Sequence, residues 1–200
     1  MATAARKPTD EALMELVKAG DEPAFQELMT RYKNRIIGFV QRTVNSRELA
    51  EDIAQEAFLR VFTKAYTFRS DGVFSTWLYR IATNLAINEL RRRRRVRFVS
   101  LQRPVRTGSG DEIALDMPDE KERGPAVAAE RNELQREIAR AVAELPVKYR
   151  VAFVLRDIQG HSYQKIAEVA DVPLGTIKSR VNRARIRFRQ LMQPYVEAEG

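Results

Sequence analysis

Apolar side chains recur every third or fourth residue along most of this chain of 200 residues, and this spacing is typical of helices that bury one face. The longest example runs through Phe25, Leu28, Met29, Tyr32, Ile36, Phe39 and Val40. No alternation of apolar and polar residues is long enough to indicate a β-strand. The chain is therefore predicted to be all-α.

We expect four helices in the N-terminal half, because capping and turn residues interrupt the apolar pattern there. They cover residues 10–19, a segment capped by Asp21, a segment from Ser46 to about Tyr66, and a segment from Phe74 to the run Arg91–Arg95. The pattern fades between Phe98 and Gly124, where six acidic residues stand against one lysine between positions 111 and 122. Prolines and Gly108-Ser109-Gly110 in this stretch predict a flexible linker.

Helical spacing resumes near Ala126, and a first helix closes at Leu145-Pro146. A short, very apolar helix from about Val151 to Ile158 precedes two further helices. The chain is thus predicted to form two small helical domains, residues 10–97 and 126–195, joined by a flexible acidic linker over residues 98–125.

The C-terminal domain contains a helix-turn-helix pattern. Ser162 caps a helix that runs through Ala170, and a tight connection leads to a second helix from Leu174 to about Met192. This second helix carries six cations and no acid between Gly175 and Gln190, namely Lys178, Arg180, Arg183, Arg185, Arg187 and Arg189. Such a helix suits a DNA major groove flanked by phosphates, although a solvated charged helix is the simpler alternative.

A helix that reads a groove presents its N-terminal residues to the bases. We therefore predict that the bases are read by Lys178, Ser179, Asn182 and Arg183. The predicted phosphate contacts are Thr176, Arg180 and Arg185.

The fourth predicted helix is the second basic element, with seven arginines and one acid between Arg80 and Arg97. On one stripe beside Trp77 lie Arg80, Asn84, Asn88 and Arg91. Asparagine amides can read base edges while arginines neutralise phosphates. Cations that only complement a helix dipole would not need five consecutive arginines, because the dipole acts over one turn. An interfacial membrane helix would carry large apolar residues opposite its cations, so nucleic acid is favoured.

The third predicted helix has the opposite charge. One side carries Glu48, Asp52, Gln55, Glu56 and Leu59, and the other carries Ile53, Ala57 and Val61. In a chain of net charge +8, this acidic stripe is either a docking face for a basic protein surface or a solvated face.

Composition narrows the function classes. The chain has no cysteine and a single histidine, which excludes disulfides, thiolate zinc sites and a histidine pair. The first ten residues lack the apolar run of a signal peptide, and no stretch approaches a membrane span. We expect a cytoplasmic protein that makes no membrane contact of its own, binds no cofactor and catalyses no reaction.

These segments together resemble the extracytoplasmic-function (ECF) sigma factors, the compact sigma subunits of bacterial RNA polymerase. Residues 51–58 (EDIAQEAF) are similar to the family's D-x-x-Q-E-x-F motif, and residues 74–84 (FSTWLYRIATN) match its F-x-T-W-L-Y-R-I-A-x-N signature. The second domain matches in Glu144-Leu145-Pro146, in residues 162–167 (SYQKIA) and in residues 173–185 (PLGTIKSRVNRAR). The resemblance covers residues 10–95 and 126–192.

The resemblance implies a non-catalytic specificity subunit with defined partners. These are the β′ clamp helices and β flap of core RNA polymerase, promoter DNA, and an anti-sigma factor that holds the protein inactive. The minus-35 element would be read by the helix-turn-helix, and the clamp helices would bind Glu48, Asp52, Gln55, Glu56 and Leu59. The minus-10 element would be bound by Phe68, Arg69, Ser75, Arg80, Asn84, Asn88, Arg91 and Arg92, with the loop from Phe68 to Ser75 holding a flipped base.

The main alternative is a stand-alone, dimeric helix-turn-helix regulator, in which the basic helix and acidic stripe of the first domain would have no evident use. A helical nuclease is poorly supported, because no metal-ligand spacing is present. His161 stands before the Ser162 cap, where the family more often has leucine, and we expect it to be structural or solvent-facing.

Overall fold

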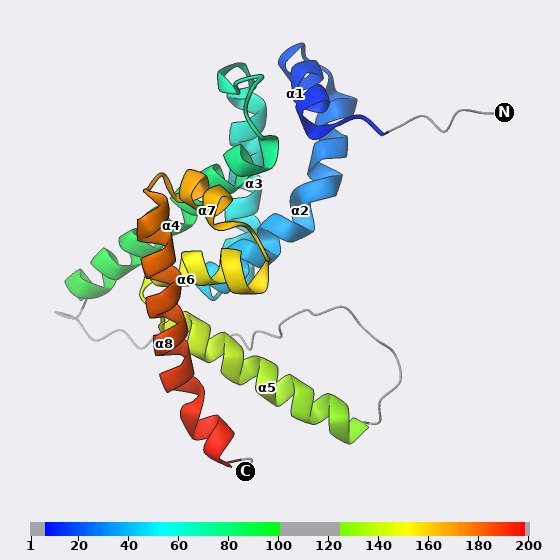
Figure 1. The fold of residues 1–200 in the computed structure, drawn as a ribbon. Helices are drawn as coiled ribbons and strands as arrows, with labels where there is room; N and C mark the ends of the chain where they lie inside the picture. Colours follow the sequence, from blue (N-terminus) through cyan, green and yellow to red (C-terminus); the bar gives the residue numbers. More distant parts are fainter. Residues whose placement is uncertain (1–6, 101–124, 199–200) are drawn as a thin grey trace.

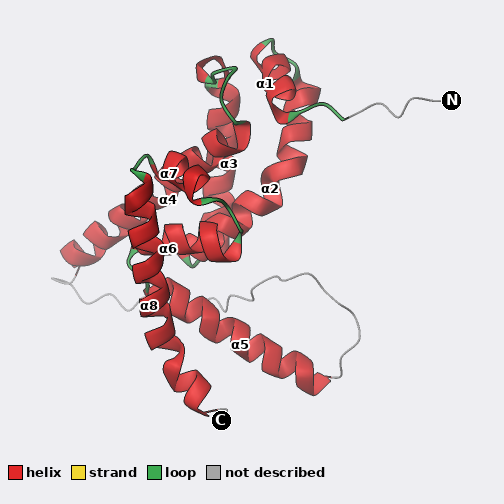
Figure 2. Cartoon of the chain, in the orientation of Figure 1, coloured by secondary structure: helices red, strands yellow, loops and turns green. Residues whose placement is uncertain are grey.

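The structure is a computed structural model that describes residues 7–100 and 125–198 (Figure 1). All regular secondary structure in these two ranges is helical, which confirms the all-α prediction (Figure 2). The elements are α1 (Asp10–Lys18), α2 (Glu22–Val44), α3 (Arg47–Thr63), the 3-10 turn η1 (Ala65–Thr67), α4 (Phe74–Ser100), α5 (Pro125–Glu144), α6 (Val147–Phe153), the π turn η2 (Val154–Ile158), α7 (Tyr163–Ala170) and α8 (Leu174–Ala198). The acidic stretch 111–122 lies outside the described residues.

The predicted helix caps are confirmed. The side chains of Asp21, Ser46 and Ser162 accept hydrogen bonds from the backbone N–H groups of residues 24, 49 and 165, at 2.8, 3.3 and 3.2 Å. Each cap supplies an acceptor for one of the N–H groups that a helix start leaves without a partner. Local sequence therefore determines where α2, α3 and α7 begin.

Several predicted helix ends were wrong by a few residues. Helix α3 stops at Thr63 and the chain tightens into η1, whereas the prediction ran to about Tyr66. Helix α4 continues to Ser100, three residues into the predicted linker, and α8 continues past Met192 to Ala198. The short helix predicted from Val151 starts earlier, at Val147, and its second half is the π turn.

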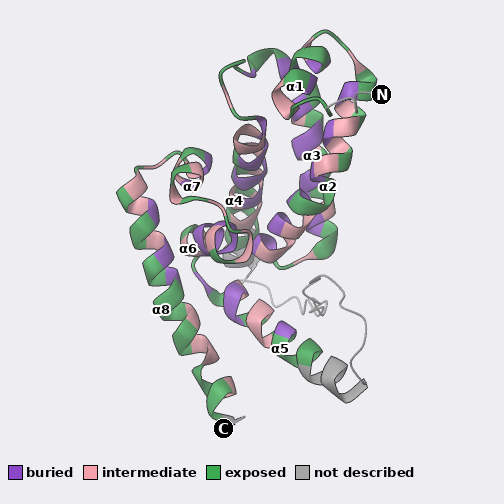
Figure 3. Ribbon diagram, turned by 45° about the vertical axis from the view of Figure 1, so that its right-hand side comes forward, coloured by how far each residue is buried: buried purple, intermediate pink, exposed green. Residues whose placement is uncertain are grey.

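Helices α1 to α4 pack around a core that contains Met14, Phe39 and Phe74, all fully buried. The ring of Phe74 meets the edge of Tyr32 at a centroid distance of 5.3 Å, which ties the start of α4 to α2. In the second domain, Ile166, Ile177 and Val181 are buried where α7 and α8 pack together. In Figure 3 buried residues gather on the helix segments that pack together, whereas exposed residues predominate along the C-terminal part of α8.

The two domains pack against each other, mainly through α4 and α7 and through contacts of α2 with α5, η2 and α6. The guanidinium of Arg150 (α6) lies where two helices end. It donates hydrogen bonds to the carbonyl oxygens of Thr43 at 2.6 Å and Leu145 at 3.0 Å, and to that of Ala143. Arg150 is 8% exposed, and burial lowers its pKa. One cation thus satisfies the carbonyl ends of α2 and α5, which carry partial negative charge.

None of the helices in residues 7–100 and 125–198 is long and apolar enough to span a membrane.

Candidate nucleic-acid and protein interfaces

The first turns of α8 form a basic surface beside α6. Lys178, Ser179, Asn182 and Arg183, the four predicted base readers, are exposed, whereas Thr176 and Arg180 are half-buried. A shallow cavity of about 370 Å³ lies here, lined by Lys148, Tyr149, Gly175, Thr176, Ser179, Arg180 and Arg183. Sequence reasoning missed Lys148 and Tyr149, because they belong to α6 and reach α8 only through the tertiary fold.

Two of the α8 arginines already bind partners within the chain. The Arg183 guanidinium donates to the Tyr149 hydroxyl at 3.3 Å, and this contact lowers the pKa of Tyr149. The Arg185 guanidinium forms an ion pair with Asp157 of η2, with a distance of 3.1 Å from Nε to Oδ2. Asp157 therefore shares the charge of Arg185, whose predicted phosphate contact would exchange this carboxylate for a phosphate and stays a prediction.

The predicted stripe on α4 is present. Arg80, Asn84, Asn88 and Arg91 are all exposed, and Trp77 packs half-buried beside them. Arg92 forms an ion pair with Glu89 at 2.7 Å, and hydrogen bonds from Arg92 and then Arg93 lower the pKa of Glu89 to about 2. The one acid of this helix therefore offsets part of the charge of the arginine run.

The loop between η1 and α4 corrects one prediction. Phe68 is 4% exposed and packs on Phe74 and Trp77, with ring-centroid distances of 6.3 and 5.3 Å. Phe68 is thus an anchor of the loop in the core and not a surface that contacts DNA. Arg69 is exposed and forms an ion pair with Asp71 at 2.9 Å, and Ser75 is half-buried at the start of α4.

The acidic stripe of α3 faces solvent. Glu48, Asp52, Gln55 and Leu59 are exposed, and the half-buried Glu56 forms an ion pair with Arg60 at 2.7 Å. The stripe continues from Leu59 into Phe62 and Tyr66, two exposed apolar residues that sequence reasoning did not assign. Leu59, Phe62 and Tyr66 are 56%, 42% and 78% exposed. Their spacing of three and four residues was the available signal, but the same spacing also predicts a buried face. An apolar patch rimmed by carboxylates is typical of a protein-binding surface.

Residues 28–96 match the family model of sigma-70 region 2, and residues 135–188 match that of sigma-70 region 4. The ECF RNA polymerase sigma-E factor of Escherichia coli K12 is 36% identical over 196 residues, covering 94% of this chain and 96% of that protein. This chain belongs to the ECF sigma factors. The RNA polymerase sigma-H factor of Pseudomonas aeruginosa is also 36% identical, covering 92% of this chain and 94% of that protein. The predicted family is confirmed.

The fold is shared with solved sigma factors. The sigma factor RpoE of Bartonella quintana, solved in complex with the anti-sigma factor NepR, superposes with a TM-score of 0.65 at 24% identity and covers 84% of this chain and 96% of that protein. The region 2 match lies within α2 to α4 of this ECF factor, and the region 4 match lies within α5 to α8. The name region 2 is used below for α1–α4 and region 4 for α5–α8.

Region 4 covers part of the predicted minus-10 surface of region 2. Arg80 forms an ion pair with Asp171 of the α7–α8 turn at 2.9 Å. The Ser75 hydroxyl accepts a hydrogen bond from Lys165 Nζ at 2.9 Å. The ring of His161 meets the edge of Tyr79 at a centroid distance of 4.9 Å, in agreement with the structural role expected for this histidine. We call this packing of region 4 on region 2 the closed arrangement.

Acidic pH is expected to destabilise the closed arrangement because it protonates His161. Burial first, then the charges of Lys165 and Arg35, lower the pKa of His161 from 6.5 to about 4. The other ionisable side chains of the cavity are Tyr32 and Tyr79, whose pKa values are raised, so they stay neutral at these pH values. The same contact also contains the Arg80–Asp171 ion pair, and Glu168 and Asp10 lie near Lys165; these groups are common to the wild type and the His161→Leu variant. Between pH 6.5 and 4, His161 is therefore protonated when the protein is unfolded but neutral in the closed arrangement. The contribution of the neutral imidazole to the stability of the closed arrangement is complete above pH 6.5 and is lost as the pH falls through this window. The melting temperature should drop more steeply for the wild type than for His161→Leu, and parallel curves would contradict this assignment.

Proposed function

We propose that this chain is an alternative sigma factor that binds core RNA polymerase, reads the minus-35 and minus-10 elements of a promoter, and melts the DNA. One observation carries the proposal: two basic, exposed helix faces lie on separate domains, and an acidic, apolar-centred face lies on α3. A polymerase that binds α3 would hold both DNA-binding faces of one chain on the same DNA molecule. A dimeric regulator would instead use the same face of two chains and would have no need of the acidic face. The protein would act in the cytoplasm as a specificity subunit without an active site of its own.

We assign the readers as follows. The minus-35 element is read by Lys178, Ser179, Asn182 and Arg183 of α8, with Thr176 and Arg180 on phosphates. The minus-10 element is bound by Arg69, Ser75, Arg80, Asn84, Asn88, Arg91 and Arg92, and the loop anchored by Phe68 holds the flipped base. Asparagine amides offer both a donor and an acceptor to an extruded base, and capture of that base offsets a few kcal/mol of unstacking, by order of magnitude.

The closed arrangement does not allow both elements to be read at once. Their centres are about 25 base pairs apart, or roughly 85 Å along B-DNA. Lys178 follows Asp171 by seven residues, and seven residues span at most about 25 Å. Because the side chains of Asp171 and Arg80 are ion-paired, Lys178 lies within about 40 Å of Arg80 in the closed arrangement. Regions 2 and 4 must therefore separate when the protein engages a promoter. We propose that an anti-sigma factor acts on this step by keeping both readers covered.

Run-off transcription tests the proposal. Purified core polymerase with this protein should produce one transcript from its promoter, and core polymerase or the protein alone should produce none. Sedimentation and footprinting test the dimeric regulator in parallel. Self-association combined with protection of a palindrome in the absence of polymerase would contradict a sigma factor.

Base reading and phosphate binding on α8 are separable by mutation. Arg183→Ala should reduce discrimination at one base pair of the minus-35 element by about 1–3 kcal/mol. Arg180→Ala should weaken binding to cognate and to scrambled DNA equally. It should also reduce the slope of log affinity against log salt concentration by about one unit. Fluorescence anisotropy at several salt concentrations measures both quantities. Equal losses on both DNAs for Arg183→Ala would show that Arg183 does not read bases.

A further inference from the structure

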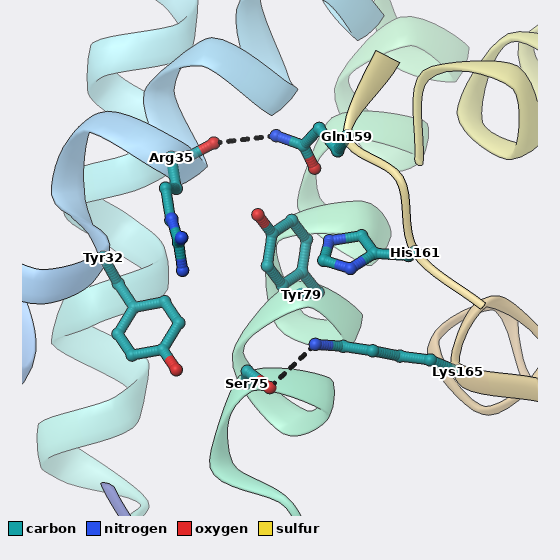
Figure 4. Close-up of a pocket in the computed structure, with 7 residues that line it drawn as sticks. All are labelled: Tyr32, Arg35, Ser75, Tyr79, Gln159, His161 and Lys165. Atoms are coloured by element: carbon teal, nitrogen blue, oxygen red, sulfur yellow. Dashed lines mark hydrogen bonds between the residues drawn. The ribbon is translucent and has the colours of Figure 1, made fainter. Parts of the chain in front are cut away.

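A cavity of about 280 Å³ lies between region 2 and region 4 and is lined by side chains from both (Figure 4). Region 2 contributes Tyr32 and Arg35 from α2 and Ser75 and Tyr79 from α4, and region 4 contributes Gln159, His161 and Lys165. Among the described residues, no carboxylate lines it. Of the assigned readers of promoter DNA only Ser75 lines this cavity, so the proposed promoter contacts give its other lining residues no role.

The cavity holds more positive charge than its surroundings neutralise. Within the described residues, the exposed Arg35 forms no ion pair, and Lys165 Nζ donates to the Ser75 hydroxyl at 2.9 Å and lies 5.7 Å from the centroid of the Tyr79 ring. His161 Nε2 is buried without a hydrogen-bond partner. The nearby carboxylate of Asp10 already binds Arg31 and the Tyr32 hydroxyl. Burial, followed by repulsion from Arg35, lowers the pKa of Lys165, although the carboxylates of Glu168 and Asp10 act in the opposite sense.

We propose that this cavity binds a small phosphate anion that bridges region 2 and region 4. A guanidinium, an ammonium and the Ser75 hydroxyl are donors of the kind that hold phosphate oxygens. A volume of about 280 Å³ lies just below the range of roughly 300–1,000 Å³ typical of sites for drug-sized ligands. Inorganic phosphate or diphosphate is therefore the class of ligand that fits.

Such an anion would favour the closed arrangement. Its donors come from both regions and are together only while the regions are packed, so the ligand binds the closed state and shifts the population toward it. Phosphate would then oppose the separation that promoter reading requires. This consequence rests on the proposed function, whereas binding of the anion does not.

The single histidine of the chain provides a direct assay of binding. The imidazole resonances of the full-length protein are followed by NMR while phosphate or diphosphate is added at constant ionic strength, with chloride as the compensating ion. The His161 signals should shift saturably, and the pKa of His161 should rise, because an anion stabilises the protonated ring. Arg35→Gln and Lys165→Gln should each weaken binding by about tenfold or more, since each removes a charge-assisted hydrogen bond. Lys33→Gln, an exposed cation on the same helix, is the matched control and should bind as the wild type does.

The absence of cysteine allows a second readout. Gln26→Cys and Gln190→Cys place one dye on an exposed position of each region, and energy transfer between the dyes reports their separation. Phosphate should increase the closed population in the wild type and leave that of Arg35→Gln unchanged. Single-stranded DNA is the comparison ligand, because its backbone offers the same chemical group.

No shift of His161 up to tens of millimolar phosphate would overturn the proposal, and so would equal responses in Arg35→Gln and Lys33→Gln. A response to single-stranded DNA alone would identify the ligand as a nucleic-acid backbone and overturn it as well. Because these assays contain no polymerase, their failure would leave the run-off result, and thus the proposed function, unaffected.

Discussion

Replacing both Asp52 and Gln55 with alanine is expected to weaken binding to core RNA polymerase by about 100-fold or more. Both side chains are exposed on α3 beside Leu59, so the substitutions remove polar contacts without disturbing the core. Each lost hydrogen bond to a charged partner costs about 1.5–3 kcal/mol, and two such losses give at least that change in affinity. Binding of labelled protein to purified core enzyme measures the effect.

The chain offers a matched control for this experiment. Glu22 and Gln26 present the same chemical groups on an exposed face of α2. Glu22→Ala combined with Gln26→Ala should leave affinity for the polymerase unchanged. Leu59→Ala should lower affinity by an amount between those of the two double variants, because the apolar centre of an interface contributes strongly to binding. If the Asp52 and Gln55 variant bound as the control does, the docking face would lie elsewhere on the protein.

Arg150→Met is expected to cause the largest loss of stability among single substitutions at the domain contact. The change removes the donors to the carbonyl groups of Thr43, Ala143 and Leu145, and a buried carbonyl without a donor costs about 1–3 kcal/mol. The variant also no longer has to bury a charged group, and this gain offsets part of the cost. We expect the free energy of unfolding to fall by about 3 kcal/mol, measured by urea denaturation followed by circular dichroism.

The position of the one tryptophan helps to locate this effect. Trp77 lies in α4, so its fluorescence reports on region 2, whereas circular dichroism reports on every helix. Arg150→Met should shift the dichroism transition more than the fluorescence transition, because two of the three carbonyls belong to region 4. Arg140→Met is the control, since its side chain is 70% exposed, and it should change stability by less than about 0.5 kcal/mol. Equal behaviour of the two variants would show that the buried guanidinium does not hold the helix ends together.

The sequence by itself determined the helices, their caps and the chemistry of the exposed faces. Asp21, Ser46 and Ser162 begin helices because each supplies an acceptor to a backbone N–H three residues ahead, a contact that needs no other part of the chain. The stripe of Arg80, Asn84 and Asn88 follows from helical periodicity alone, and so does the acidic face of α3. Family motifs then added the expected partners.

The tertiary structure decided what spacing along the chain does not encode. Phe68 became a core residue because Phe74 and Trp77 close over it, although its loop reads as a surface turn. Arg185 is neutralised by an acid 28 residues away, and Arg80 by an acid 91 residues away. The cavity between Arg35 and Lys165 exists only because two domains meet. Such contacts depend on how whole helices pack, whereas caps and amphipathic faces depend on neighbours within a few residues.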